Sequence, residues 1–312
     1  MIRYINSEGK EYKLLDKNFP TIDPKKPYAL TKEEEDIMER LERAFENCEK
    51  LQRHMHFLLN KGGLYKVYNG NLLYHGCVPL KEDGNLKSVR IFGRSYKGKG
   101  LYEVLESYVR KGFYAMDPKE KERGKDIMWY IWLSENSPLF GKDKMATFER
   151  YFLAEKETHK EKKNPYYLLL EDEKVVEKIL KEFGLENEDA HIINGHVPVK
   201  CKDGENPVKC GGKVLVIDGG FSKAYQKETG IAGYTLIYNS YGLILAAHKP
   251  FESTEAAIEK ESDIHSDSTV VKRTLERKKV EDTDVGKELK EQISDLEVLL
   301  AAYRSGVIAE RM

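Results

Sequence analysis

The sequence is poor in cysteine and has no long apolar run. Its four cysteines are spread over 312 residues, which excludes a small disulfide-stabilised fold and indicates a reducing compartment. No segment approaches the roughly 18 consecutive apolar residues that a transmembrane helix needs. The first ten residues also lack the apolar core of a signal peptide. We therefore predict a cytoplasmic protein with no membrane partner.

The chain also has almost no net charge. Its 52 Lys and Arg residues are balanced by 53 Asp and Glu residues, for a net charge of −1. Without a cationic excess, the composition gives no reason to expect a nucleic-acid partner. The hydrophobic fraction of 40% is sufficient for a sizeable core, and the length suits one large or two ordinary domains.

Two apolar segments far apart in the chain end in the same way. The first runs through Leu72–Tyr74 into His75, and the second runs through Ile192–Ile193 to His196. Each histidine has a glycine neighbour and is followed by a Val-Pro pair, a pattern typical of a strand that ends at an open position. We interpret His75 and His196 as candidate metal ligands. A hydrogen-bonded structural role is the equally weighted alternative, because their separation matches no local zinc motif.

The remaining pattern predicts both helices and strands. Thr31 and Glu34 form a capping box that begins a helix to about Leu59, and Asn69-Gly70 predicts a hairpin. The aromatic-rich run 126–133 is predicted to be buried, and strands dominate 190–250, including 197–200. From Ser253 onward the chain is predicted to be helical.

Two further groups of residues have chemistry that the pattern leaves open. Cys201 and Cys210 lie on a predicted loop between strands, but two thiols alone make no zinc site. The basic, glycine-rich stretch 93–100 carries Arg94 and Lys97, which could hold a phosphate. A solvated loop is the favoured alternative, because the spacing fits no nucleotide-binding motif.

Six long motifs of the chain are specific enough to compare with known families. They are Asn71–Pro79, Phe140–Arg150, Glu157–Pro165, Ile193–Val199, Ile217–Gln226 and Thr229–Gly242. Together they resemble the class 3 fructose-1,6-bisphosphatases, a family similar to the calcineurin-like metallophosphoesterases. The resemblance implies an α/β (α+β) fold, an αββα sandwich of mixed sheets flanked by helices. It also implies a two-metal site, usually Mn2+, and hydrolysis of fructose 1,6-bisphosphate in gluconeogenesis. His75-Gly76 and Gly195-His196 match the last two metal-binding motifs of that family.

The chain departs from the family pattern at the first three metal-binding motifs. It has no Gly-Asp dipeptide and no Gly-Asn-His. Asp189–His191 and Asp263–His265 spell the first motif, Asp-x-His, but both follow His75, and we interpret them as chance. The chain therefore resembles a C-terminal half, with the general acid expected in the other half. The alternative is an inactive structural or regulatory fragment that binds the missing half or an effector. As partner we expect either further copies of the chain, in an oligomer, or an N-terminal half that it complements.

A phosphate-binding arginine of related phosphatases is also absent, because Trp132–Asn136 is followed by Ser137-Pro138. Lys142 and Lys144 are candidates to replace it, beside Arg94 and Lys97. We expect three parts in the chain: a lead-in over 1–30, the phosphoesterase part over 31–252 with a helical insertion at about 100–185, and a helical extension over 253–312.

Overall fold

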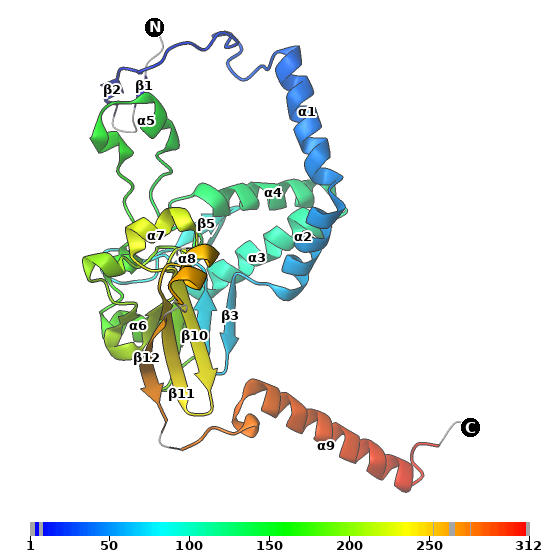
Figure 1. Cartoon of the computed structure of the whole chain (residues 1–312). Coiled ribbons are helices and arrows are strands. Elements are labelled where there is room, and N and C mark those ends of the chain that lie inside the picture. The colour runs from blue at the N-terminus through cyan, green and yellow to red at the C-terminus, as the bar shows by residue number, and fades with distance from the viewer. Residues whose placement is uncertain (1–3, 6–8, 252, 262–265, 275, 310–312) are drawn as a thin grey trace. The chain divides into compact units, whose positions relative to one another are not determined.

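The computed structural model describes residues 4–5, 9–251, 253–261, 266–274 and 276–309 (Figure 1). The chain forms two compact units. Unit 1 combines residues 1–64 with 100–164, and unit 2 combines residues 65–99 with 165–312. The chain therefore leaves and re-enters each unit. The predicted three-part division follows different boundaries and stays a prediction.

Unit 1 is mostly helical. Its elements are β1 (Tyr4–Ile5), β2 (Glu11–Tyr12), α1 (Lys32–Glu46), α2 (Glu49–Lys61), α3 (Gly98–Tyr114), α4 (Pro118–Leu133), α5 (Thr147–Phe152) and the 3-10 helix η1 (Lys156–His159). The first two residues of α3 belong to unit 2.

Unit 2 contains most of the strands. Its strands are β3 (Tyr65–Tyr68), β4 (Asn71–Tyr74), β5 (Val89–Ile91), β6 (Arg94–Tyr96), β7 (His191–Asn194), β8 (Val208–Lys209), β9 (Val214–Val216), β10 (Gly233–Asn239), β11 (Gly242–His248) and β12 (Ser266–Arg273). Its α-helices are α6 (Glu173–Glu182), α7 (Lys223–Thr229), α8 (Thr254–Glu259) and α9 (Asp284–Arg304), with 3-10 turns η2 (Pro165–Leu168), η3 (Cys201–Asp203), η4 (Cys210–Gly212) and η5 (Val280–Asp282).

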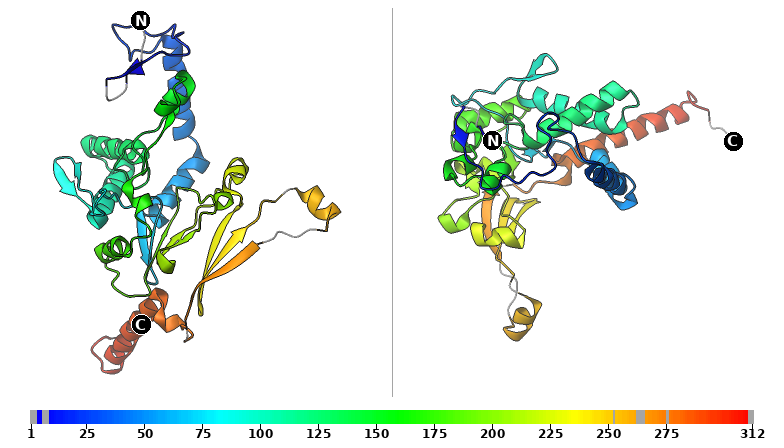
Figure 2. Two further views of the ribbon diagram at one scale, coloured as in Figure 1. Left: turned by 90° about the vertical axis from the view of Figure 1, so that its left-hand side faces the viewer. Right: turned by 90° about the horizontal axis from the view of Figure 1, so that it is seen from above.

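The main sheet of unit 2 has five strands in the order β3-β4-β7-β9-β8. The three central strands β4, β7 and β9 are parallel, and the edge strands β3 and β8 are antiparallel to them. A second, antiparallel sheet has the order β10-β11-β12 (Figures 1 and 2). The mixture of parallel and antiparallel sheets with helices confirms the predicted α+β class.

The core of unit 2 lies between these two sheets. Leu73, Ile193 and Leu215 occupy one row across β4, β7 and β9, and they pack with residues of the second sheet such as Leu243. The neighbouring row points to the other face of the sheet, because side chains alternate along a strand. Helix α6 lies against β7 and contributes buried apolar residues of its own. The central strands are buried on both faces, as is usual for parallel strands.

Helices α3 and α4 of unit 1 approach each other at a pair of glycines. A Cβ atom added at Gly124 would lie 2.2 Å from the backbone nitrogen of Gly112, so only glycine permits this contact. Asp117 caps α4 by accepting a hydrogen bond from the Glu120 amide at 2.9 Å. Arg110 of α3 donates hydrogen bonds to carbonyls at the end of α2, including that of Gly62 at 3.1 Å, which satisfies acceptors that the helix leaves free.

The structure corrects the predicted helix between Thr31 and Leu59. The capping box at Thr31 and Glu34 is confirmed, but the helix ends at Glu46 and a second one begins at Glu49. The Asn47 side chain donates a hydrogen bond to the Arg43 carbonyl at 2.9 Å. An asparagine side chain that bonds the backbone in this way competes with the helix and favours its end.

The prediction that the run 126–133 is wholly buried is wrong. The run belongs to α4, in which Ile127 and Ile131 are buried, whereas Trp129 and Trp132 are 60% and 59% exposed. Residues four apart share one face of a helix, so the two isoleucines face inward and the tryptophans point elsewhere. The helical period, rather than the apolar content of the run, decides its burial.

Two other expectations from the sequence are also wrong. Residues 197–200 form no strand, although the Val199 amide donates to the Asp218 carbonyl at 2.8 Å. The segment predicted as helical beyond Ser253 includes β12, which pairs with β11. Polar and charged residues on an exposed edge strand such as β12 mask its β character in the sequence.

Candidate active site

The candidate site lies at the edge of the main sheet where its parallel strands end. His75 directly follows β4, and His196 stands two residues beyond β7. Because β4 and β7 are adjacent and parallel, their carboxyl ends meet at the same edge. His75 Nε2 and His196 Nδ1 are 2.9 Å apart, and the ring centroids are separated by 4.8 Å. The fold therefore joins two histidines that are 121 residues apart in sequence.

The backbone around this pair is held by hydrogen bonds between the two strand ends. The Gly195 amide donates to the His75 carbonyl at 2.9 Å. The buried Asn194 side chain donates from Nδ2 to the Gly76 carbonyl at 3.1 Å. Together these two hydrogen bonds hold the turn that contains His196 against the turn that contains His75. His75 itself is exposed, so the pair is open to a ligand from solvent.

His196 adopts a backbone conformation that is uncommon for a residue with a side chain. Its φ angle is +67°, in the left-handed region that costs an L-residue roughly 1 kcal/mol. Such strained residues cluster at functional sites, where the surrounding structure holds them in place. This observation favours a functional role for His196 over a purely structural one.

Asp218 is a neighbour of this pair to which the sequence reasoning gave no role. It follows β9, the third parallel strand, and a Cβ atom at Gly195 would lie 3.5 Å from the Asp218 Cβ. Its Oδ1 accepts a hydrogen bond from the Gly220 amide at 3.0 Å. The position of Asp218 just after β9 could have identified it. When three neighbouring strands are parallel, the residues that follow them lie at the same edge of the sheet.

Electrostatics keep His75 in the form that binds metals. Although His75 is exposed, neighbouring protein atoms desolvate part of its ring and lower its pKa below the usual value, and the Asp218 carboxylate opposes that shift. The net shift is downward, so the imidazole is neutral near pH 7. A neutral imidazole offers a lone pair to a first-row metal ion.

The pair fits a metal site in the type of its donors but not in their number. Imidazole nitrogens suit Mn2+ and similar ions alongside oxygen ligands, and the two nitrogens face one another. Among the described residues, however, no group of three or more His, Cys, Asp or Glu side chains is placed to hold a metal ion. His75 and His196 could thus provide part of a metal site, with further ligands from elsewhere.

Comparison with known proteins identifies the family. Residues 2–305 match the sequence profile described as Firmicute fructose-1,6-bisphosphatase. The chain belongs to this family. It is 57% identical over 310 residues to the class 3 fructose-1,6-bisphosphatase of Alkaliphilus metalliredigens, covering 98% of this chain and 47% of that protein. It is 55% identical over 309 residues to the Clostridium tetani protein of the same name, covering 99% and 47%.

The chain thus spans about half the length of the curated relatives it matches. No solved structure matches the chain. Among the described residues, no helix is both long and apolar enough to cross a membrane.

The four predicted phosphate-binding cations of this family member lie in different places. Arg94 and Lys97 are exposed on and beside β6 in unit 2, and neither has an ion-pair partner among the residues that the structure describes. Lys142 and Lys144 lie in unit 1. Lys142 pairs with Glu161 at 2.9 Å, and Lys144 donates to the Thr158 carbonyl at 2.8 Å. No described contact within unit 2 joins Arg94 or Lys97 to the histidine pair, and the phosphate role of all four residues stays a prediction.

The other residues that the sequence singled out do not join the pair. His191 is buried on β7, and its Nδ1 donates to Asn71 Oδ1 at 3.1 Å. Asp189 pairs with Lys272, so the Asp-x-His at 189–191 is no metal motif. Asp263–His265 lies outside the described residues.

Both loop cysteines are free, and the Cys201 Sγ lies 2.7 Å from the Tyr234 hydroxyl.

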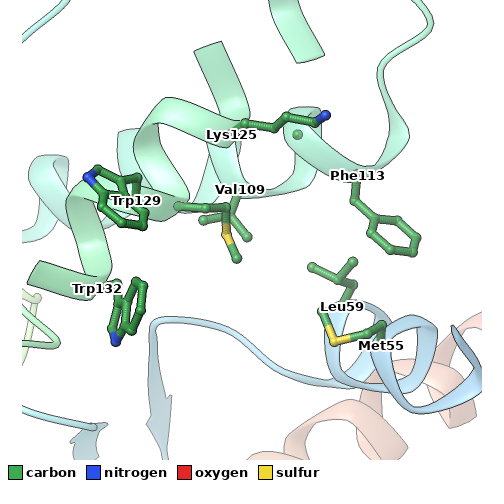
Figure 3. A pocket seen from close by; sticks show the side chains of 9 residues that line it. Met55, Leu59, Val109, Phe113, Lys125, Trp129 and Trp132 are labelled. Atoms are coloured by element: carbon green, nitrogen blue, oxygen red, sulfur yellow. The ribbon is translucent and has the colours of Figure 1, made fainter. Parts of the chain in front are cut away.

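Unit 1 holds a separate cavity of about 470 Å³ between α2, α3 and α4 (Figure 3). The tryptophans of α4 line one part of it and Met55, Leu59 and Phe113 line another, with Lys125 as the one charged lining residue. A cavity with this apolar lining lacks the convergent cations that a sugar bisphosphate requires. The histidine pair, rather than this cavity, is therefore the candidate for chemistry.

Proposed function

We propose that this chain carries part of the active site of a fructose-1,6-bisphosphatase, the activity in the printed names of its relatives. The reaction would convert fructose 1,6-bisphosphate and water to fructose 6-phosphate and phosphate. The observation that carries the proposal is the convergence of His75 and His196 at 2.9 Å in a chain of this family. Two imidazoles at the carboxyl edge of a parallel sheet are well placed to share in binding a metal and a substrate.

In this proposal His75 and His196 hold Mn2+ together with ligands from outside this chain. The metal, when bound, would polarise the phosphoryl oxygens of the substrate. His75 is neutral near pH 7, so it can bind the metal without first losing a proton. The Asp218 carboxylate adds negative charge beside the pair, which favours a cation there.

The first test measures metal binding by the purified chain. Titration calorimetry with Mn2+ should show weak binding, because two neutral ligands do not compensate the charge of the ion. The His75→Ala and His196→Ala variants should each lose it by tenfold or more, on the order of 1.4 kcal/mol. His54→Ala is the control, since His54 is exposed on α2 in unit 1. Equal binding by all variants would contradict the assignment.

The second test measures phosphate release from fructose 1,6-bisphosphate. The chain is mixed with the segment of the Alkaliphilus metalliredigens protein that it does not match. We expect Mn2+-dependent release from the mixture, none from either part alone, and none when the chain carries His75→Ala. Release that survives His75→Ala would contradict the catalytic assignment. A mixture that associates but releases no phosphate would instead support a non-catalytic, structural role.

A further inference from the structure

Helix α9 carries an apolar seam with the spacing of a coiled coil. Along its 21 residues, large apolar side chains recur in alternating steps of four and three, the pattern that keeps one stripe facing a partner helix. Every member of the seam is exposed, and Gly286 is the one buried residue of the helix. We define the seam as Leu289, Ile293, Leu296, Leu300 and Tyr303.

The start of α9 is fixed to the rest of unit 2 while the seam is left uncovered. The Asp284 amide donates to Asn69 Oδ1 at 2.9 Å, and Asp284 Oδ2 accepts from the Asn69 amide at 2.7 Å. Asn69 lies in the β3–β4 hairpin, whose second strand leads to His75. Beyond this anchor the described side chains of the helix are not buried. An exposed apolar stripe of this kind marks a surface for another protein segment.

Two charges beside the seam indicate which segment it fits. Lys290 and Glu297 both occupy the position that follows a seam leucine, one heptad apart. If two copies of α9 lie antiparallel, with Ile293 of each opposite Leu296 of the other, Lys290 of each copy faces Glu297 of the other. A parallel pair would place Lys290 and Glu297 against Val285 and Gln292 instead, with no opposite charge. The helix is thus complementary to itself in one orientation and one register.

We propose that α9 is a self-association surface, which pairs two copies of this chain through an antiparallel contact of the seam. The interface is isologous, since the same surface serves both copies. Lys290 pairs with Glu281 of its own chain at 3.1 Å, but both side chains are well exposed, and such pairs contribute little. Glu297 has no ion-pair partner among the described residues, so it is available to the second copy.

The first experiment compares the mass of the full chain with that of two matched variants by sedimentation equilibrium at micromolar concentrations. The wild type should have twice the chain mass of 36.0 kDa, and Leu296→Glu should be monomeric. Val298→Glu is the control: Val298 is 67% exposed against 63% for Leu296, but it lies on the opposite face of α9. Far-ultraviolet circular dichroism checks that the variants stay folded.

The second experiment tests the orientation. Lys290→Glu should raise the dissociation constant of the dimer about three- to tenfold, because two exposed pairs become repulsive. Lys290→Glu combined with Glu297→Lys should restore the wild-type value, since the pairs re-form with reversed sign. Glu281→Gln, which removes only the pair within one chain, should leave the dimer intact.

Each of the following results would overturn the proposal. One is a monomeric wild type, which would mean that the seam contacts a segment of the same protein molecule and not a second copy. Another is a dimer that survives Leu296→Glu, which would place the interface elsewhere. A dimer that depends on Leu296 but shows no rescue by the double charge reversal would exclude the antiparallel register.

Discussion

His191 and His75 are both neutral near pH 7, but for His191 the consequence concerns stability. His191 is buried on β7, and burial, with Lys272 adding to it, lowers its pKa to about 4. The Asn71 side chain, whose Oδ1 accepts the hydrogen bond from His191, is itself oriented because its Nδ2 donates to the carbonyls of Tyr68 and Asn69. His191 therefore has a structural role inside the sheet, whereas His75 and His196 lie at its edge.

This environment makes the stability of unit 2 depend on pH. Between the usual pKa of about 6.5 and the folded value of about 4, the unfolded chain binds more protons than the folded one. The free energy of unfolding is thus highest above pH 6.5 and falls as the pH drops through this window. We expect a loss of no more than about 3 kcal/mol. Urea unfolding measures the free energy of unfolding at about pH 7 and at about pH 5. The difference between the two values should be smaller for His191→Gln than for the wild type, and equal differences would contradict the assignment.

At the scale of elements, the contact between α3 and α4 depends on two glycines. A methyl group at Gly124 would overlap the backbone of α3 at Gly112 and the Tyr108 carbonyl. Unlike a flexible side chain, a helix backbone cannot move aside without separating the two helices. The same contact fixes how the two tryptophans of α4 are presented to the cavity beside it (Figure 3).

We predict that Gly124→Ala destabilises unit 1 by about 3 kcal/mol, at the upper end for overpacking. Gly100→Ala is a matched control, because Gly100 also lies in a helix but has no atom within 4 Å of an added Cβ. There the gain in helix propensity should leave stability unchanged or raise it by about 0.5–1 kcal/mol. Thermal unfolding of both variants measures the difference, and equal midpoints would refute the close contact.

At the scale of the whole molecule, the two compact units suggest two separate unfolding reactions. Domains with their own cores commonly unfold as independent units. We expect two transitions in differential scanning calorimetry. Gly124→Ala should lower the midpoint of one, and His191→Gln should alter the pH dependence of the other. A single transition that responds to both substitutions would show that the units unfold together.

The sequence alone determined the local features of this protein. The capping box at Thr31 and the hairpin at Asn69-Gly70 follow from short-range rules about caps and turns, and the structure agrees with them. The α+β class was implied by the family resemblance, and the structure agrees with it as well. The family also followed from the sequence, because long motifs can be recognised from their residues alone, without knowledge of the fold around them. His75 and His196 were singled out by their matched contexts.

Only the tertiary structure decided which of these features meet. The pairing of β4 with β7 and of β7 with β9 brings His75, His196 and Asp218 to one edge, and no local rule sets the order of strands in a sheet. The exposure of Trp129 and Trp132 depends on which face of α4 turns inward. Such outcomes depend on packing and on long-range pairing, which a single sequence does not display.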